Sequence, residues 1–328
     1  MQIRTLGAKL AVASFFGAAA ISGSAFAADL SSGGDGGGYK DAAPPPSYFT
    51  DDSISFRYGT AFKEPGVNCG NCLPGESGND IEKGIGNFQH FNTDKWGSNF
   101  IDMDLLFSTG QDPVQCAGCN KFGSGGTIGA TEFYGVFRRF WSYNGITDSH
   151  YSNFLINDFG LNMGGDLGTK NDPFSEEKRS LVIGPKVSFA MPAGFLTLAV
   201  DYYHEWNHNG FANAATEFES YDVEAVWMYP FKIGDSSLKF KGFFTYIAPK
   251  GNQPCYSGVG FAPTDCKTVG EILTRPELDL DVGAYFGSPN KFEVGFAYEY
   301  WLNKFGNNHD EIPGALANTP ELVARYHF

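Results

Sequence analysis

The chain has 328 residues and a formal net charge of −14; aromatic residues make up 16% of it, charged residues only 18%, and 42 positions are glycine. So many aromatic residues exclude a disordered polymer, and the composition is not that of a helical bundle. The acidic balance argues against binding of a nucleic-acid polymer, which needs clustered cations. Aromatic side chains and glycines together favour strands and turns.

The N-terminus has the pattern of a secretory signal peptide. Arg4 and Lys9 supply positive charge, residues 10–21 are apolar, and residues 25–27 (AFA) form a small-x-small cleavage site. The apolar run is shorter than the roughly 20 residues that a membrane-spanning helix needs. We therefore expect residues 1–27 to be removed, and no transmembrane helix in the mature chain.

Residues 28–50 have the composition of a linker. The run SSGGDGGG at 31–38 is flexible, and the three prolines at 44–46 favour an extended conformation. Neither part can bury a core. We expect a disordered periplasmic tether, followed by the folded domain at residues 51–328.

From residue 51 onward the hydrophobic period is two, which indicates strands. In residues 292–301, Phe, Val, Phe, Tyr and Tyr alternate with Glu, Gly, Ala, Glu and Trp, and residues 278–286 alternate in the same way. The connections after odd-numbered strands are mostly long, and those after even-numbered strands mostly short, the fourth excepted. The predicted strands lie near 53–63, 84–92, 99–108, 130–141, 154–167, 179–191, 195–207, 217–229, 238–248, 276–287, 291–303 and 320–328.

Two architectures fit such a chain, a soluble sandwich or barrel and an outer-membrane barrel. Strands of about 10 residues, an even count and alternating short turns and long loops favour the membrane barrel. The last residues, LVARYHF at 322–328, alternate and end in Phe328, like the signal read by the barrel insertion machinery. Aromatic residues at strand ends resemble interfacial girdles: Tyr58, Phe62, Trp141, Trp206, Trp227, Tyr229, Tyr298 and Tyr300.

We therefore predict an all-β fold, a 12-stranded antiparallel transmembrane β-barrel with short periplasmic turns and longer extracellular loops. It would lie in the outer membrane of a Gram-negative cell, with lipid around it. We expect a monomer.

All six cysteines fall in predicted long loops. Two CxxC pairs, at 69–72 and 116–119, could form a four-cysteine zinc site, but passage through the periplasm favours disulfides. The pairing cannot be deduced from spacing. The disulfide candidates are Cys69, Cys72, Cys116, Cys119, Cys255 and Cys266, and we predict neither a metal site nor a cofactor.

Inward positions carry the polar side chains of such a barrel. Many would form ion pairs between neighbouring strands, and the others would make a polar channel wall whose acidic excess disfavours anions. Twelve strands lie between the size filled by side chains and the wide porin size, which favours a narrow pore. The predicted substrate-binding residues of the lumen are Arg57, Asp102, Asp104, Tyr134, Arg138, Tyr203, Glu205, Phe243, Tyr285, Glu299 and Trp301.

Five segments, taken in order, resemble the Tsx/OmpK family of nucleoside-specific outer-membrane channels, in the branch of outer envelope proteins. They are FRYGTAFKEP at 56–65, NFIDMDLL at 99–106, DYYHEWN at 201–207, APKG at 248–251 and YWLNKFGN at 300–307. The resemblance covers residues 53–328. It implies a 12-stranded barrel with a narrow lumen and passive uptake of nucleosides past aromatic and ionisable residues. The cysteine-bearing loops and the tether depart from it.

The leading hypothesis is therefore a channel for passive, substrate-selective uptake of nucleosides or similar small polar solutes. The alternatives are a structural or adhesive barrel with binding loops and a general small-solute porin. An outer-membrane hydrolase would need a serine and a histidine paired near the rim. His90 and His204 have no evident serine partner, so we predict that the chain is not an enzyme.

Overall fold

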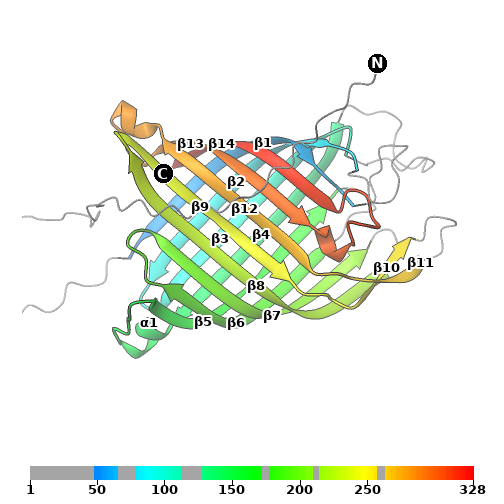
Figure 1. Ribbon diagram of the computed structural model, residues 1–328, viewed down its shortest axis with the longest axis horizontal. Helices are drawn as coiled ribbons and strands as arrows, with labels where there is room; N and C mark the ends of the chain where they lie inside the picture. Colours follow the sequence, from blue (N-terminus) through cyan, green and yellow to red (C-terminus); the bar gives the residue numbers. More distant parts are fainter. Residues whose placement is uncertain (1–47, 66–77, 113–127, 172–176, 210–213, 257–262) are drawn as a thin grey trace, which may run out of the picture. The chain divides into compact units, whose positions relative to one another are not determined.

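The computed structural model describes residues 48–65, 78–112, 128–171, 177–209, 214–256 and 263–328, and twelve strands in these ranges close into one antiparallel barrel (Figure 1). This confirms the predicted fold class. The barrel strands are β1 (Thr50–Phe62), β2 (Ile81–Asp94), β3 (Gly97–Thr109), β4 (Ile128–Ser142), β5 (Ile156–Lys170), β6 (Lys178–Phe189), β7 (Phe195–Asn209), β8 (Ala214–Ile233), β9 (Ser236–Ile247), β12 (Glu271–Asp281), β13 (Phe292–Leu302) and β14 (Leu316–His327).

Each barrel strand pairs with the next along the chain, and the first pairs with the last. The β1–β14 seam runs from Ser53 opposite His327 to Gly59 opposite Glu321. At its end the Phe328 N–H donates to the Asp52 carbonyl at 3.0 Å. Strand β9 pairs directly with β12, because β10 (Asn252–Tyr256) and β11 (Pro263–Lys267) form a separate hairpin.

The two ends of the barrel differ in their connections. The termini of the barrel, a two-residue turn between β2 and β3, helix α1 (Tyr143–Thr147) and the 3-10 helix η1 (Gly283–Phe286) lie at the end with short turns, which is the periplasmic end. The 3-10 helix η2 (Lys304–Gly306) lies at the extracellular end. Within the described ranges, no helix has the length and apolar character needed to cross a membrane.

Side chains alternate between an apolar outside and a polar inside. On β1, Phe56 is 56% exposed, whereas its neighbour Arg57 is 1% exposed. The same inversion recurs around the barrel, with aliphatic and aromatic side chains outward and buried Asp, Glu, Lys and Arg inward. In water an apolar surface of this extent would be unfavourable, whereas lipid covers it without cost. The protein is therefore an outer-membrane barrel.

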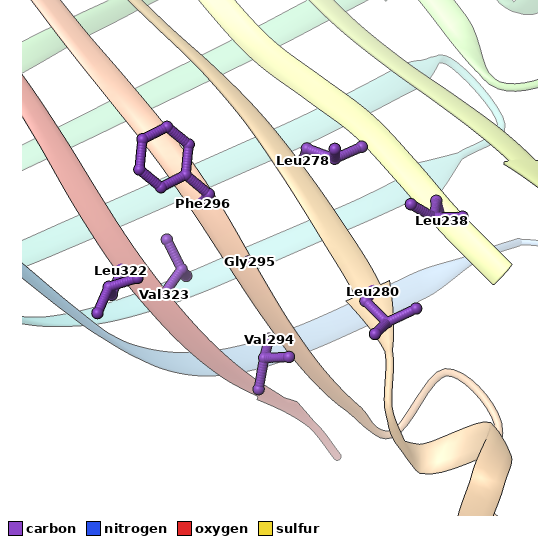
Figure 2. A pocket seen from close by; sticks show the side chains of 8 residues that line it. All are labelled: Leu238, Leu278, Leu280, Val294, Gly295, Phe296, Leu322 and Val323. Carbon is purple, nitrogen blue, oxygen red and sulfur yellow. The ribbon is translucent and has the colours of Figure 1, made fainter. Parts of the chain in front are cut away.

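The outer wall contains a shallow apolar hollow over four neighbouring strands. Figure 2 shows its lining on β9, β12, β13 and β14. The lining residues are Leu238, Leu278, Leu280, Val294, Gly295, Phe296, Leu322 and Val323. Most of these side chains are on the exposed face, so lipid acyl chains fill the hollow in the membrane.

The structure corrects several predicted boundaries. Strand β1 begins at Thr50, within the predicted tether. Strands β7 and β8 extend beyond their predicted ends, so the predicted loop 208–216 shrinks to residues 210–213. Strand β12 ends at Asp281 rather than at 287, since the chain turns into η1.

Phe62 was predicted to lie in an aromatic girdle, and this is wrong. It is buried against Ile81 and Ile85. The register of β1 against β2 shifts between Gly59 and Phe62, and such a bulge reverses the alternation of the faces.

Several predictions fall on residues outside the described ranges. These are the signal peptide at 1–27, most of the tether, and the four cysteines Cys69, Cys72, Cys116 and Cys119. Cys255 and Cys266 lie on the neighbouring strands β10 and β11, where the backbone register places Cys255 opposite Thr264 and Cys266 opposite Gln253. A disulfide between them stays a prediction.

Candidate functional site: the polar lumen

The alternation places the predicted lumen residues on the inner face, with one exception. Tyr285 is not on a strand; it lies in η1 at the periplasmic end, is 55% exposed, and its hydroxyl lies 2.7 Å from that of Ser236. The physical reason is the side chain of Asp281, which accepts hydrogen bonds from the N–H groups of Ala284 and Asn290 and so stabilises the turn. The predicted lumenal position of Tyr285 is wrong.

Arg138 connects distant walls of the lumen. Its Nε donates to Glu224 on β8 at 2.9 Å, and its Nη1 donates to Asp166 on β5 at 2.8 Å. Three strands separate β4 from β8 in the barrel, so this contact crosses the interior. Lys186 and Lys178 stand 4.0 Å from Glu224 and Asp166 respectively. The Arg138–Glu224 ion pair therefore narrows the lumen at this level.

Two tyrosines and a lysine form an aromatic wall above Arg138. The Lys178 Nζ lies 5.8 Å from the ring centre of Tyr134 and 5.6 Å from that of Tyr203. The Tyr203 hydroxyl donates to Glu205, which also accepts from Lys250 at 3.0 Å. Tyr134, Arg138, Tyr203 and Glu205 were all predicted from the sequence, and the fold gathers them on β4 to β7.

A second group of predicted residues lies on β1 and β3. Arg57 forms a hydrogen-bonded ion pair with Asp104, and its Nε is 3.8 Å from Glu321. Asn87 donates to Asp102 at 2.5 Å and to Asp104 at 2.7 Å, so it bridges the two carboxylates. The buried Glu321 carboxylate has no hydrogen-bond partner among the described residues. In this group the carboxylates of Asp102, Asp104 and Glu321 outnumber the cationic side chain, that of Arg57.

The third group is a dense ion-pair network on β9, β12, β13 and β14. Arg325 Nη1 donates to Glu277 at 2.8 Å and to Asp279 at 2.9 Å. Lys241 pairs with the same two carboxylates and lies 3.6 Å from Glu293. Each cation here serves acids on adjacent or next-but-one strands, so the network holds one wall together.

Phe243, Glu299 and Trp301 occupy the remaining predicted inner positions. The Arg275 guanidinium lies 5.2 Å from the Phe243 ring centre. Trp301 donates through Nε1 to Glu271 at 2.7 Å. Phe243 and Trp301 contact Arg275 and Glu271 respectively, so the predicted residues fall into several groups along the lumen.

Glu64 organises the extracellular mouth. Its Oε1 accepts from Lys83 at 2.6 Å and from Lys304 at 3.2 Å, and Lys170 lies 3.8 Å away. Burial alone would raise the pKa of Glu64, but the three lysines outweigh burial and hold this pKa well below its usual range. Glu64 thus connects β2, β5 and the loops after β1 and β13 at the extracellular mouth.

A glycine allows the last of these loops to approach Glu64. Gly314 has φ +80°, and a Cβ there would lie 2.1 Å from the Glu64 carbonyl oxygen. Lys304 also donates to the Lys63 carbonyl at 3.0 Å. Any other residue at 314 would push the two loops apart.

Sequence reasoning missed several inner residues. Asp166 follows the alternation of its predicted strand, and that period could have identified it. Glu64, Lys250 and Lys304 come from connections, where no period exists to indicate an inward side chain. Within the described part of the chain, no group of three His, Cys, Asp or Glu residues has the arrangement of a metal site.

Comparisons with known proteins assign no family. No family model matches the chain. No curated protein matches it either.

Solved structures similar to this chain are barrels of the outer membrane and of autotransporters. The translocator domain of the autotransporter NalP from Neisseria meningitidis is 10% identical, covering 85% of this chain and 88% of its own, with a TM-score of 0.35. The β domain of the Bordetella autotransporter BrkA is 8% identical, covering 85% of this chain and 99% of its own, with a TM-score of 0.34. OmpT of Vibrio cholerae, expressed in the outer membrane, is 12% identical, covering 88% of this chain and 100% of its own, with a TM-score of 0.30. Likeness of this degree transfers no activity.

The prediction that the chain is not an enzyme is wrong, because enzymatic activity is not excluded. The similar structures include OmpT of Vibrio cholerae alongside autotransporter domains. A barrel scaffold hosts unrelated activities, which depend on the site rather than on the fold.

Proposed function

We propose that the protein is an outer-membrane channel for passive, substrate-selective uptake of small polar solutes with a planar face, nucleosides being the best candidates. The observation that carries this proposal is the aromatic wall on β4 to β7. Tyr134 and Tyr203 flank Lys178 at 5.8 and 5.6 Å, and Arg138 and Glu205 stand next to them. Planar aromatic faces beside charged donors and acceptors suit a ring that carries hydroxyl groups.

The mechanism needs no covalent step. A solute would enter past the Glu64 mouth, exchange part of its hydration for contacts with the aromatic wall and leave toward the periplasm. Stacking on an aromatic ring contributes about 1–3 kcal/mol per base and tolerates different bases. Acidic side chains outnumber basic ones on the inner face, and this excess disfavours anions.

Two related proposals accompany the channel. The chain would reach the outer membrane as a secreted precursor, with insertion machinery reading the C-terminal strand that ends in Phe328. The barrel would act as a monomer.

The test is a matched pair of aromatic variants on one strand, β4. Tyr134 faces the lumen and is partly exposed, whereas Phe137 is on the outer face. We expect adenosine or thymidine to block the ion current of the wild-type protein in planar bilayers. Tyr134→Ala should weaken this block by roughly tenfold, which is the loss of one stacking contact, and Phe137→Ala should leave it unchanged.

Equal blocks in all three proteins would refute the role of the aromatic wall. Current without any nucleoside block would indicate a general porin.

A structural or adhesive barrel is the second candidate, and the cross-lumen contacts favour it. Arg138–Glu224 spans the lumen from β4 to β8, and the lysines around Glu64 connect β2, β5 and the loop after β13 at the extracellular mouth. If purified, refolded protein shows neither conductance nor solute uptake, this second function stands and the channel is refuted.

A further inference from the structure

Three phenylalanine rings form a row at the periplasmic mouth of the lumen. The ring centre of Phe49 lies 6.1 Å from that of Phe91, and Phe91 lies 6.5 Å from Phe195 with the ring planes only 8° apart. Phe91 is on β2 and Phe195 on β7. Around the closed barrel, β3 to β6 separate these strands on one side and β1, β14, β13, β12, β9 and β8 on the other. The row therefore crosses the interior.

The alternation of β2 and β7 places the Phe91 and Phe195 rings on the inner face. Phe91 belongs to the same face of β2 as Lys83 and Asn87, which bond to lumenal acids. Phe195 belongs to the same face of β7 as Asp201 and Tyr203, both buried. Phe195 is the first residue of its strand, and Phe91 lies three residues before the end of β2. The contact is thus at the periplasmic end.

Phe49 is held in place by its own backbone. Its N–H donates to Thr93 Oγ1 at 2.9 Å, and its carbonyl accepts from the Thr93 N–H at 2.8 Å. The chain therefore enters the barrel along the end of β2, directly beside Phe91. The third ring extends the row on the side where the chain enters.

More apolar side chains surround the row. Phe100 is the cross-strand partner of Phe91, and Phe140 on the inner face of β4 has Lys186 Nζ at 6.0 Å from its ring centre. In contrast, the same end of the opposite wall carries the ion pairs of Lys239 and His327 with Glu293. An apolar constriction of this kind repels water and hydrated ions without a mobile gate.

We propose that the Phe49–Phe91–Phe195 row is an ion barrier of the channel: it slows small hydrated ions while neutral solutes with an apolar face pass. This inference rests on the proposed channel function and places an apolar barrier at the periplasmic mouth, in series with the charged lumen.

The experiment uses Phe195→Ala, Phe91→Ala and the control Phe240→Ala in the full chain. Phe240 is a lipid-facing phenylalanine of β9, so its truncation removes a ring without touching the lumen. Two quantities are measured on each protein: potassium chloride conductance in planar bilayers, and uptake of radiolabelled adenosine into proteoliposomes. Heat-modifiable mobility on gels identifies the variants that are folded barrels.

We expect a several-fold higher ion conductance for Phe195→Ala and Phe91→Ala than for wild type and Phe240→Ala. Unchanged conductance in a folded lumen variant overturns the barrier, and so does an equal rise in Phe240→Ala. Uptake of adenosine by the wild type is read separately: its absence refutes the channel function even when the phenylalanine variants open an ion path.

Discussion

The lumen contains two large ion-pair networks, and they are built differently. The network of Arg325 and Lys241 joins neighbouring strands, and its acids, Glu277 and Asp279, each contact both cations. The network of Arg138 reaches across the interior to β8 and leaves Oδ1 of the buried Asp222 without a hydrogen bond. The first stabilises the wall, while the second limits the bore beside the aromatic residues.

The largest expected effect comes from breaking the wall network. Arg325→Met leaves the buried Glu277 and Asp279 to share Lys241, whereas Arg138→Met leaves one lysine near each acid; removing one partner of a buried ion pair costs about 3–5 kcal/mol. Urea unfolding of the barrel in detergent micelles measures this loss. The exposed Arg179→Met is the control and should change stability by less than about 0.5 kcal/mol. A similar midpoint for both variants would contradict a stabilising role of the network.

Breaking the cross-lumen pair should cost less stability and change transport more. In Arg138→Met, Lys186 and Lys178 stay 4.0 Å from the abandoned acids, so we expect a loss of about 2 kcal/mol. Ion conductance should rise, because the side chain no longer bridges β4 and β8. If Arg325→Met raises conductance equally, the two networks do not divide these roles.

The smallest effect is expected at the extracellular mouth, and it depends on pH. The pKa of Glu64 is lowered in the folded protein, so its ion pairs stabilise the barrel at neutral pH and are lost as the pH falls through that low pKa. Glu64→Gln should cost about 1.5 kcal/mol at pH 7. The difference from wild type should begin to shrink as the pH falls below the ordinary glutamate pKa of 4.5, as unfolding between pH 3 and pH 7 would show; a constant difference would contradict the ion-pair origin.

The sequence predicted most of the fold because a period of two is a strong local signal. It failed where local pattern and tertiary structure disagree. Tyr285 continues the alternation of β12, yet the chain turns into η1 after Asp281, which accepts from the Ala284 N–H, and the left-handed Gly287 ends this turn. Phe62 changes face because of a bulge that no residue pattern announces.

The lumen was predictable only in part, for a geometric reason. Alternation identifies an inward side chain such as Arg138 but not its partner. Glu224 lies 86 positions away along the chain, and the pairing depends on which walls the closed barrel brings into reach. Loop residues such as Lys304 enter the lumen from connections that have no periodicity.

The seam between β1 and β14 has a kinetic consequence. Every other neighbouring pair in the barrel can form from consecutive segments of the chain, but this pair joins residues such as Ser53 and His327, which are at opposite ends of it. Closure is therefore a single contact-forming step of very high sequence separation, the kind that slows folding most. Until it happens, β1 and β14 are two open sheet edges that can pair with other chains, so a growing barrel is at greatest risk of aggregation just before its last strand arrives.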